Sequence, residues 1–472
     1  MQEEDLQGHS SRVRFRRSIT LLLMTLFAPG TAQLVAGNKA VGRFAVRVLL
    51  GVLGVGALAA LLAWLAPNLL VGLFTNSAVL AVLRIVLLIF AVGWLLLFID
   101  AWRLGRPLGL ERKQRLTATI ATATMSLVCV GALLLGSQYV AVARESIDGI
   151  FGAGKKSDPN AGRYNILLLG GDAGPDREGL RPDSITLVSV DEDTGHTAMF
   201  SFPRNLQRVP FPRGTVMHEQ FPNGFHCDSC LLNAVYTWAN DHKELFPGVP
   251  DPGIVATKDA ISGLTGLPVN YYVLIDLFGF RQLVDAVGGL TIDVKKNVPI
   301  GGIGSERSGT IKAGKQKLDG YRSLWYARSR TGSSDYDRMA RQRCVMAAML
   351  DQLDPGTVLL KFQAIAKAGK QVMSTDIPSS ELGKFVDLSM RVKKQKITSV
   401  QFVPPLIRAS HPNVTLIQSK VRSAIDASNG VVPTPTAAKK PVKAPQPSKS
   451  IKSNGTKSPE PVGDLNSVCA AA

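Results

Sequence analysis

Cysteine is scarce in this sequence, with five residues among 472, and acidic residues are outnumbered by basic ones. So few cysteines exclude a small domain held together by a framework of disulfides. The amino terminus lacks the combination of a charged start, a short apolar core and a small-residue cleavage site, so we expect no cleaved signal peptide. Against 36 acidic residues stand 54 lysines and arginines, and the net charge of +18 favours anionic partners.

Apolar residues make up 46% of the chain and are concentrated in its first 140 residues. Three runs there are long enough to cross a membrane, at 44–66, 78–99 and 117–141. A fourth apolar stretch, 19–37, is interrupted by Pro29-Gly30. This stretch could form a full span, a re-entrant hairpin or an interfacial segment.

Loop charge predicts how the membrane region is oriented. The 100–116 loop carries five basic residues, whereas the 67–77 loop carries no charge. Basic short loops stay in the cytoplasm, so the last span should deliver everything after it to the outside of the cell. We therefore predict a cytoplasmic basic segment, a multi-span helical membrane region and a tether, at 1–17, 18–141 and 142–162.

The part of the chain from 163 to 428 alternates strand-like and helix-like segments, which predicts one α/β domain with a central mixed sheet flanked by helices. The expected strands are 164–171, 184–191, 196–203, 270–276 and 290–294, and the expected helices are 254–264 and 278–287. Residues 429–472 are rich in Pro, Lys and Ser, and this tail is predicted to be disordered.

One stretch of the domain is unusually rich in arginine. Residues 326–343 read YARSRTGSSDYDRMARQR, with five arginines, two aspartates and no lysine. The guanidinium fork matches two phosphate oxygens and stays charged when partly buried, so the stretch favours a polyanionic partner. We expect Arg328 and Arg330 to alternate on a strand and thus to share one of its faces.

A helix should follow, since Ser334 and Asp337 match a capping box. Asp337 is therefore expected to cap this helix rather than to bind a ligand. Arg338, Arg341 and Gln342 have the spacing of one helical face. Arg343 lies off that face and is expected to be exposed, while Cys344 is expected in the helix core.

Two aspartates lie at the ends of neighbouring predicted strands. Asp172 follows the strand 164–171, and Asp183 opens the next one. Paired carboxylates at strand ends suit Mg²⁺, which keeps waters and substrate phosphate in its coordination shell. Asp172 could instead cap a turn after Gly-Gly. Arg204 points off the end of the strand 196–203, whereas Asp176 and Glu178 are interpreted as solvated loop charges.

The remaining cysteines support several interpretations. Cys227 and Cys230 are predicted to form a local disulfide, as suits a domain outside the cell. Zinc binding together with His218 and His226 is an alternative, although the spacing matches no standard zinc site. Cys129 lies in a predicted span, and Cys469 in the tail is unassigned.

Four separate motifs resemble the LytR–CpsA–Psr family, in order over roughly 163–350. They are NILLLGGD with RPDSITLVSV and FSFPRN, then LNAVYTWA, then VNYYVLIDLFGFRQLVDAVGGLTIDV, and finally LDGYRSLWYARSRTGSSDYDRMARQR. The resemblance implies a membrane-anchored bacterial enzyme with an extracellular α/β domain. It also implies transfer of a glycopolymer from a polyprenyl-pyrophosphate carrier to peptidoglycan, with Mg²⁺ as cofactor and Mn²⁺ as an alternative.

The same resemblance implies roles for individual residues. Asp172 and Asp183 match the metal ligands of the family. The matches to its substrate-binding and catalytic positions are Arg181, Arg204, Arg328, Arg330, Asp335, Arg338 and Gln342, of which Arg204 and Asp335 are the catalytic candidates. Asp335 is the candidate base, although a carboxylate among arginines has little tendency to take a proton. Asn205 stands where the family often has aspartate, and the several spans exceed its usual single anchor.

Two other functions use the same features. A lipid pyrophosphatase would hydrolyse the same carrier with water as the acceptor. A membrane-bound transcriptional attenuator would need no catalysis, but nothing in the sequence resembles a helix-turn-helix, and the predicted topology keeps the basic cluster away from nucleic acid.

Overall fold

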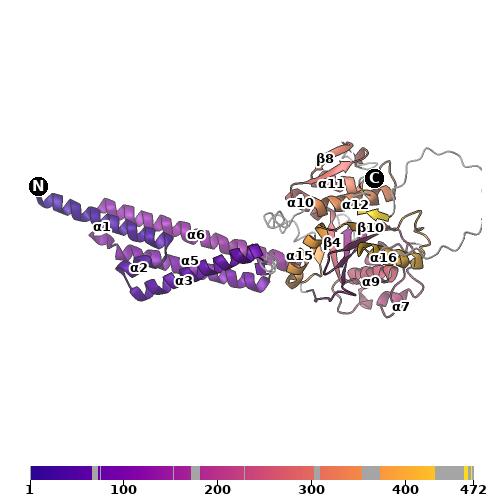
Figure 1. Ribbon diagram of the computed structural model, residues 1–472, viewed down its shortest axis with the longest axis horizontal. Helices are drawn as coiled ribbons and strands as arrows, with labels where there is room; N and C mark the ends of the chain where they lie inside the picture. Colours follow the sequence, from indigo (N-terminus) through magenta and orange to yellow (C-terminus); the bar gives the residue numbers. More distant parts are fainter. Residues whose placement is uncertain are drawn as a thin grey trace, which may run out of the picture. The chain divides into compact units, whose positions relative to one another are not determined.

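The computed structural model describes residues 2–65, 73–74, 76–151, 154–171, 181–227, 229–301, 309–352, 373–430, 462–465 and 469. Within it the chain divides into two compact units, Met1–Asp148 and Gly149–Ala472. The first consists of helices and the second contains the sheets (Figure 1).

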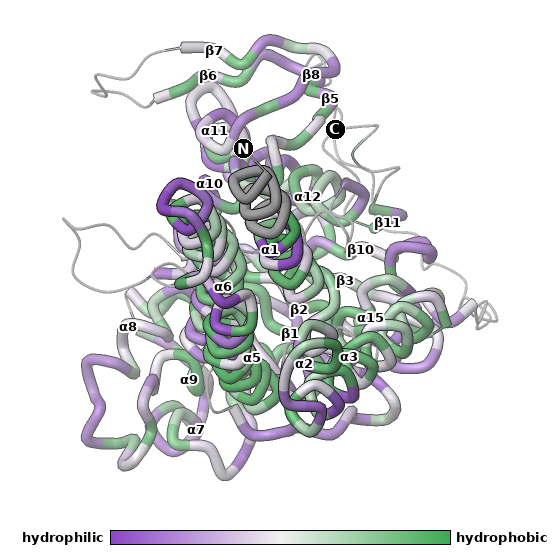
Figure 2. The backbone as a smooth tube through the Cα atoms, turned by 90° about the vertical axis from the view of Figure 1, so that its left-hand side faces the viewer, coloured by the Kyte–Doolittle hydropathy of each residue, from purple (hydrophilic) through white to green (hydrophobic). Residues whose placement is uncertain are grey.

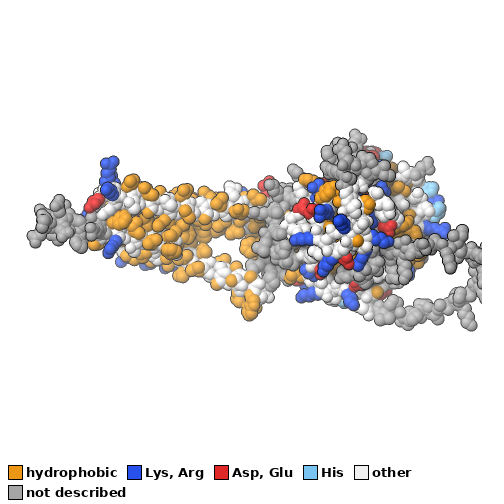
Figure 3. Space-filling view, turned by 90° about the horizontal axis from the view of Figure 1, so that it is seen from above, with side chains coloured by type: hydrophobic (Ala, Val, Ile, Leu, Met, Phe, Trp, Pro, Cys, Tyr) orange, Lys and Arg blue, Asp and Glu red, His pale blue; other side chains and the backbone are white. Residues whose placement is uncertain are grey.

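The first unit is built from long apolar helices. Its helices are α1 (Gln2–Phe27), α2 (Thr31–Ala36), α3 (Lys39–Leu65), α5 (Ser77–Leu104), the short 3-10 turn η1 (Pro107–Gly109) and α6 (Arg112–Ile150). Among the described residues, three helices are long and apolar enough to cross a membrane, at Lys39–Leu65, Ser77–Gly109 and Arg112–Gly149. They coincide with the three predicted spans. The backbone trace of Figure 2 colours much of these helices as hydrophobic, and hydrophobic side chains gather on the face that Figure 3 shows.

The apolar stretch 19–37 is not one continuous helix. The chain breaks between α1 and α2, where Gly30 adopts a positive φ of 96°. A Cβ on Gly30 would lie 2.7 Å from the carbonyl oxygen of Gly42, so glycine allows the backbones of α2 and α3 to approach closely. Gln33 is fully buried and its Nε2 donates to the Asp100 carboxylate at 3.2 Å, which ties α2 to α5. An unbroken full span over 19–37 is therefore excluded.

The second unit is centred on a mixed sheet. The described residues form seven strands in the order β11-β10-β3-β2-β1-β4-β9. Their bounds are β1 (Arg163–Gly171), β2 (Pro182–Asp191), β3 (Thr197–Phe202), β4 (Tyr271–Asp276), β9 (Met373–Thr375), β10 (Ile397–Gln401) and β11 (Val462–Asp464). Strand β1 runs antiparallel to β2 and parallel to β4. The predicted mixed α/β domain is thus confirmed, and the strand predictions in this sheet agree to within two residues.

Helices cover both faces of this sheet. On one face Leu167, Leu187 and Phe200 pack with residues of α8 (Ala234–Asp241), α9 (Pro252–Thr265) and α16 (Val414–Ser428). On the other face Tyr164 and Met199 pack with α12 (Asp335–Gln352) and α15 (Leu382–Lys393). The shorter elements of this unit are α7 (Val216–Gln220), η2 (Lys243–Leu245) and η3 (Ser379–Glu381).

Helix α12 also packs against a smaller subdomain. Two small sheets, β5 (Leu290–Val294) with β8 (Gly314–Leu318) and β6 (Val298–Ile300) with β7 (Gly309–Ile311), accompany α10 (Leu277–Ala286) and α11 (Gly320–Arg328). Val345 of α12 is buried in this subdomain, whereas Ala347 is buried against the main sheet. Because α12 packs on both sides, the arginines that it carries have a fixed position.

The predicted tether begins later than expected. Helix α6 continues to Ile150, so 142–150 is helical. Part of the remaining stretch is bound to the sheet, since the backbone N–H of Ser157 donates to the Tyr271 hydroxyl at 2.8 Å. Phe151 forms an isolated bridge with Thr375.

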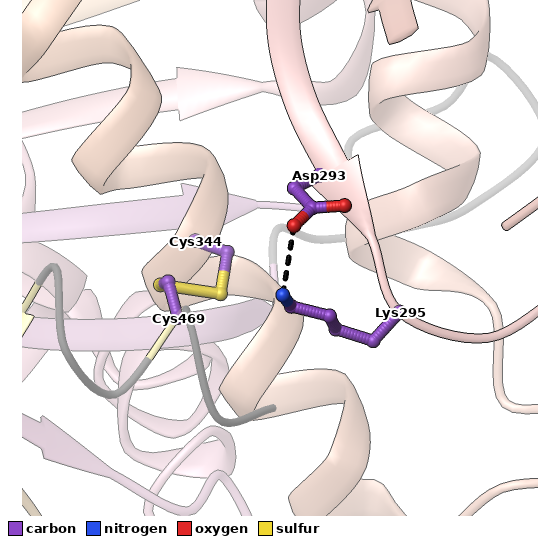
Figure 4. Close-up of a disulfide and its surroundings, with 4 residues drawn as sticks. All are labelled: Asp293, Lys295, Cys344 and Cys469. Atoms are coloured by element: carbon purple, nitrogen blue, oxygen red, sulfur yellow. Dashed lines mark hydrogen bonds and ion pairs between the residues drawn. A yellow bond between two sulfur atoms is a disulfide. The ribbon is translucent and has the colours of Figure 1, made fainter. Parts of the chain in front are cut away.

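The prediction of a disordered tail is wrong for the last part of the chain. Residues Val462–Asp464 form β11, which pairs antiparallel with β10, and Leu465 is 2% exposed. Cys469 forms a disulfide with Cys344 of α12, with 5.2 Å between the Cα atoms (Figure 4). A segment rich in Pro, Lys and Ser cannot form a hydrophobic core of its own. A few of its residues can still pair with the edge strand of an existing sheet. Residues 431–461 lie outside the described residues.

Candidate functional site

Three arginines and two aspartates from distant parts of the chain form one network of ion pairs. Arg204 donates from Nη1 to Oδ1 of Asp183. The guanidinium of Arg338 lies 3.1 Å from the Asp335 carboxylate and 4.0 Å from Oδ2 of Asp183. Nη1 of Arg330 lies 3.7 Å from Oδ1 of Asp335. Arg338 therefore links the two carboxylates, and three positive charges face two negative ones.

Sheet register explains why Asp183 and Arg204 meet. Strands β2 and β3 are antiparallel, and Ile185 pairs with Phe202. The start of β2 therefore lies beside the end of β3. Asp183 is the second residue of β2, and Arg204 follows β3 by two residues. The predicted position of Arg204, just past the end of β3, therefore brings it beside Asp183.

A capping box fixes the first turn of α12, where Asp335 and Arg338 lie. The Asp337 backbone N–H donates to the Ser334 hydroxyl at 3.1 Å, and the Asp337 carboxylate accepts from the Ser334 N–H at 2.8 Å. The capping role predicted for Asp337 is confirmed. Partial burial alone would raise the pKa of Asp337, but these bonds from Ser334 outweigh it and lower the pKa.

Burial differs strongly among the members of the network. The side chain of Arg338 is 3% exposed and that of Arg330 is 55% exposed, while Asp183, Arg204 and Asp335 are about one quarter exposed. Burial lowers the pKa of the Arg338 guanidinium, and the Asp335 charge partly restores it. The network thus has a fixed inner arginine and an outer arginine that solvent and ligands can reach.

The predicted strand for Arg328 and Arg330 is wrong. Arg328 is the last residue of α11, a helix that Asp319 caps by accepting from the Arg322 N–H at 2.7 Å. Arg330 lies beyond that helix, in the turn that leads to α12. The two arginines therefore share no strand face, because the cap at Asp319 selects a helix where the alternation suggested a strand.

The predicted helical face is only partly correct. Arg341 donates from Nε to the Tyr326 carbonyl at 2.8 Å and also bonds to the Ser329 carbonyl, so it fixes the α11–α12 turn. Gln342, by contrast, lines a small cavity between α12 and the sheet, together with Ser184 and Ser201. Arg338 contacts the two acidic residues of the network, Asp183 and Asp335.

The expectation that Arg343 is exposed is wrong. Its side chain is 2% exposed, and among the described residues none accepts a hydrogen bond from its Nε, Nη1 or Nη2. Burial lowers the pKa of Arg343 to about 10. The helical spacing in the sequence indicates this burial. Arg343 follows Met339 by four residues and precedes Met346 by three, so it shares their helical face.

The predicted metal site is only partly within the described residues. Asp172 lies outside them, as do Asp176 and Glu178, and Arg181 is exposed directly before β2. Gly171, the residue before Asp172, pairs with Pro182, the residue before Asp183. Within the described ranges no three His, Cys, Asp or Glu side chains gather as a metal site, and Asp183 is already paired with Arg204. The described residues alone therefore do not form a metal centre.

Cys227 and Cys230 are joined in the structure by a disulfide with an S–S distance of 2.01 Å. Both thiols are used in this bond, which leaves neither as a zinc ligand. The bond stabilises the loop that precedes α8 and does not contribute to the arginine network.

The fold and the network together define an α/β domain with an arginine-rich site suited to anions, in a chain that also carries apolar helices long enough to cross a membrane. Comparison with known proteins identifies the family. Residues 139–416 match the LytR_cpsA_psr family, and the chain belongs to it.

Two curated relatives illustrate the similarity. The cell wall biosynthesis protein LcpA of Corynebacterium glutamicum is 29% identical over 296 residues, which cover 56% of each chain. A polyisoprenyl-teichoic acid–peptidoglycan teichoic acid transferase, TagU of Enterococcus faecalis, is 25% identical over 58% of this chain and 84% of its own length. Among solved structures, Bacillus subtilis TagV has 23% identity, covers 57% of this chain and 98% of its own, and gives a TM-score of 0.41.

Proposed function

We propose that this protein transfers a glycopolymer from a polyprenyl-pyrophosphate carrier to peptidoglycan, on the outer side of a bacterial cell membrane. The observation that carries the proposal is the convergence of Arg204, Arg330 and Arg338 around two carboxylates. The names of the relatives support it, since LcpA is named for cell wall biosynthesis and TagU as a teichoic acid transferase.

The chemistry of the donor fits this network. A pyrophosphate diester carries two negative charges, and phosphoryl transfer depends mainly on positioning and charge stabilisation. An acceptor hydroxyl would attack the phosphorus that carries the glycopolymer. The bond from that phosphorus to the bridging oxygen would break, and polyprenyl phosphate would leave with the electron pair. Arg204, Arg330 and Arg338, with Arg181, Arg328 and Gln342, are proposed to hold the two phosphates.

The proton of the acceptor hydroxyl needs a base. Asp335 is proposed for this role, because it is one quarter exposed and lies beside Arg330, the outer arginine of the network. Its contacts with Arg330 and Arg338 fix its orientation. Arg204 is proposed to stabilise the charge that develops on the phosphoryl oxygens.

We further propose that Asp183 and Asp172 bind Mg²⁺, or Mn²⁺ in its place, when the donor is present. A magnesium ion needs only one or two carboxylates if waters and substrate phosphates supply its other ligands. The bound ion would neutralise phosphate charge. Because Asp183 pairs with Arg204 in the structure, metal binding would require the carboxylate to share or exchange this partner.

Replacing Asp183 with asparagine should remove stimulation by Mg²⁺ and reduce turnover by about 10²-fold, the effect expected when one electrostatic group of an active site is lost. Binding of Mn²⁺, followed by electron paramagnetic resonance, should be lost as well. Asp193→Asn, in an exposed hairpin turn, is the matched control and should leave both measurements unchanged. If Asp183→Asn bound Mn²⁺ as the wild type does, the assignment of Asp183 as a ligand would be wrong.

The outer location makes a separate prediction. An alkaline phosphatase reporter joined to the carboxyl terminus should be active, because the 100–116 loop is the most basic short loop and should remain inside. The same reporter placed within that loop, after Gly109, should be inactive. The reverse pattern would contradict both the topology and the proposed substrate.

Incubation with a lipid-pyrophosphate-linked oligosaccharide and peptidoglycan fragments tests the function itself. The proposal predicts a covalent oligosaccharide–peptidoglycan product, detected by mass spectrometry. Release of free phosphorylated oligosaccharide alone would identify a lipid pyrophosphatase. No consumption of the donor would leave a role without catalysis, such as transcriptional attenuation, as the better account.

A further inference from the structure

Arg343 lies on α12, five residues after Arg338, on the side of the helix that faces the sheet. It lines a cavity of about 30 Å³ together with Gln342, Met339 and Met346 from the same helix. From the sheet, Ser184, Thr186 and Ser201 contribute their hydroxyl-bearing side chains to the lining. Ser184 directly follows Asp183, so the cavity and the network share the start of β2.

The polar groups around this cavity have more donors than acceptors. The guanidinium of Arg343 has no acceptor among the described residues, and no carboxylate is among the residues that line the cavity. The Thr186 and Ser201 hydroxyls bond to each other at 3.1 Å. The described residues thus hold a positive charge, without a counter-charge among them, in a space lined largely by methionine and hydroxyl groups.

Such a buried charge is unfavourable for folding, since it loses hydration and gains no ion pair in return. The same desolvation lowers the pKa of Arg343 to about 10. The cavity has room for one or two waters. Water would satisfy some of the donors but would leave the charge uncompensated. An anionic oxygen of similar size would satisfy both, and methionine side chains adapt readily to a larger group.

We propose that Arg343 is an anion-binding residue that accepts a phosphate oxygen of the donor, at the inner wall of the site formed by Arg204, Arg330 and Arg338. This inference rests on the proposed function, since the donor supplies the phosphate. The proposal makes a specific statement about the stability of the protein with and without ligand. The unliganded protein carries an uncompensated charge, and binding of the phosphate relieves it.

Two opposite effects of one substitution test this role. In the full-length protein in detergent micelles, Arg343→Met should raise the thermal unfolding midpoint without ligand by a few degrees. It should also weaken binding of geranylgeranyl pyrophosphate at least tenfold. Arg343→Lys keeps the charge but loses the fork, so it should weaken binding while changing the midpoint little. Arg341→Met is the control, and it should lower the midpoint because Arg341 bonds to two backbone carbonyls.

A lower midpoint for Arg343→Met with wild-type affinity would overturn the proposal and make Arg343 a structural residue. Parallel titrations with inorganic pyrophosphate separate this inference from the proposed function. If inorganic pyrophosphate bound in a manner dependent on Arg343 and the lipid-linked form did not bind, the anion site would stand and the proposed donor would be wrong. If the wild type bound neither, both would fall.

Discussion

Arg338→Met is expected to destabilise the sheet unit by about 3–5 kcal/mol, the usual result of removing one partner from a buried charge network. Arg338 is 3% exposed and is the one residue that contacts both Asp183 and Asp335 in the described network. Its loss would leave both carboxylates without their shared partner, so transfer activity should also be abolished. Chemical denaturation and the transfer assay measure the two effects separately.

Arg330→Met is the matched control for this substitution. Arg330 contacts Asp335 at 3.7 Å but is 55% exposed, so its removal should change the free energy of unfolding by less than about 1 kcal/mol. Activity should nevertheless fall, because the outer arginine is proposed to bind the donor. Equal destabilisation by the two substitutions would contradict the distinction between an inner and an outer arginine.

Loss of the Cys344–Cys469 disulfide is the second large expected effect. The two cysteines are 125 residues apart, and a chain-entropy estimate for closing a loop of that size is about 4–5 kcal/mol. Replacing both with serine should therefore lower the free energy of unfolding strongly. Activity should fall too, because Cys344 lies on α12, the helix that carries Arg338 and Gln342.

The disulfide between Cys227 and Cys230 provides the comparison. It closes a loop with a sequence separation of 3, for which the same estimate gives about 2 kcal/mol. Replacing these two cysteines with serine should cost less stability and leave the site intact. If both double substitutions had the same effect on stability and activity, the last residues of the chain would have no special role in positioning α12.

Local pattern predicts four of the seven strands described in the main sheet, β1 to β4. The strand-like runs 164–171 and 184–191 predict β1 and β2, and apolar length predicts the three candidate spans. Local pattern failed where a residue depends on distant partners. The strand edge available to Val462–Asp464 is formed by β10, and no pattern within the tail indicates that edge.

In the candidate site, too, local pattern identifies the residues but not their contacts with distant parts of the chain. Its members could be named from the motifs, but their roles depend on contacts between residues far apart in sequence, such as Asp183 with Arg338. For Arg343, its charge and its helical position lead to opposite expectations. A charged residue is expected to be exposed. The spacing of Arg343 from Met339 and Met346 instead puts it on the helical face that packs against the sheet, where it is buried.

Binding of geranylgeranyl pyrophosphate to the full-length protein tests the central claim most directly, since the claim is that this arginine network binds a pyrophosphate through paired hydrogen bonds. Arg330→Lys conserves charge but loses the fork, and it should weaken binding by about 1.5–3 kcal/mol. Arg213→Lys, at an exposed arginine outside the described network, should bind as the wild type does. Equal affinity of the wild type and both variants would show that the cluster acts only as a diffuse positive field, which would contradict this account.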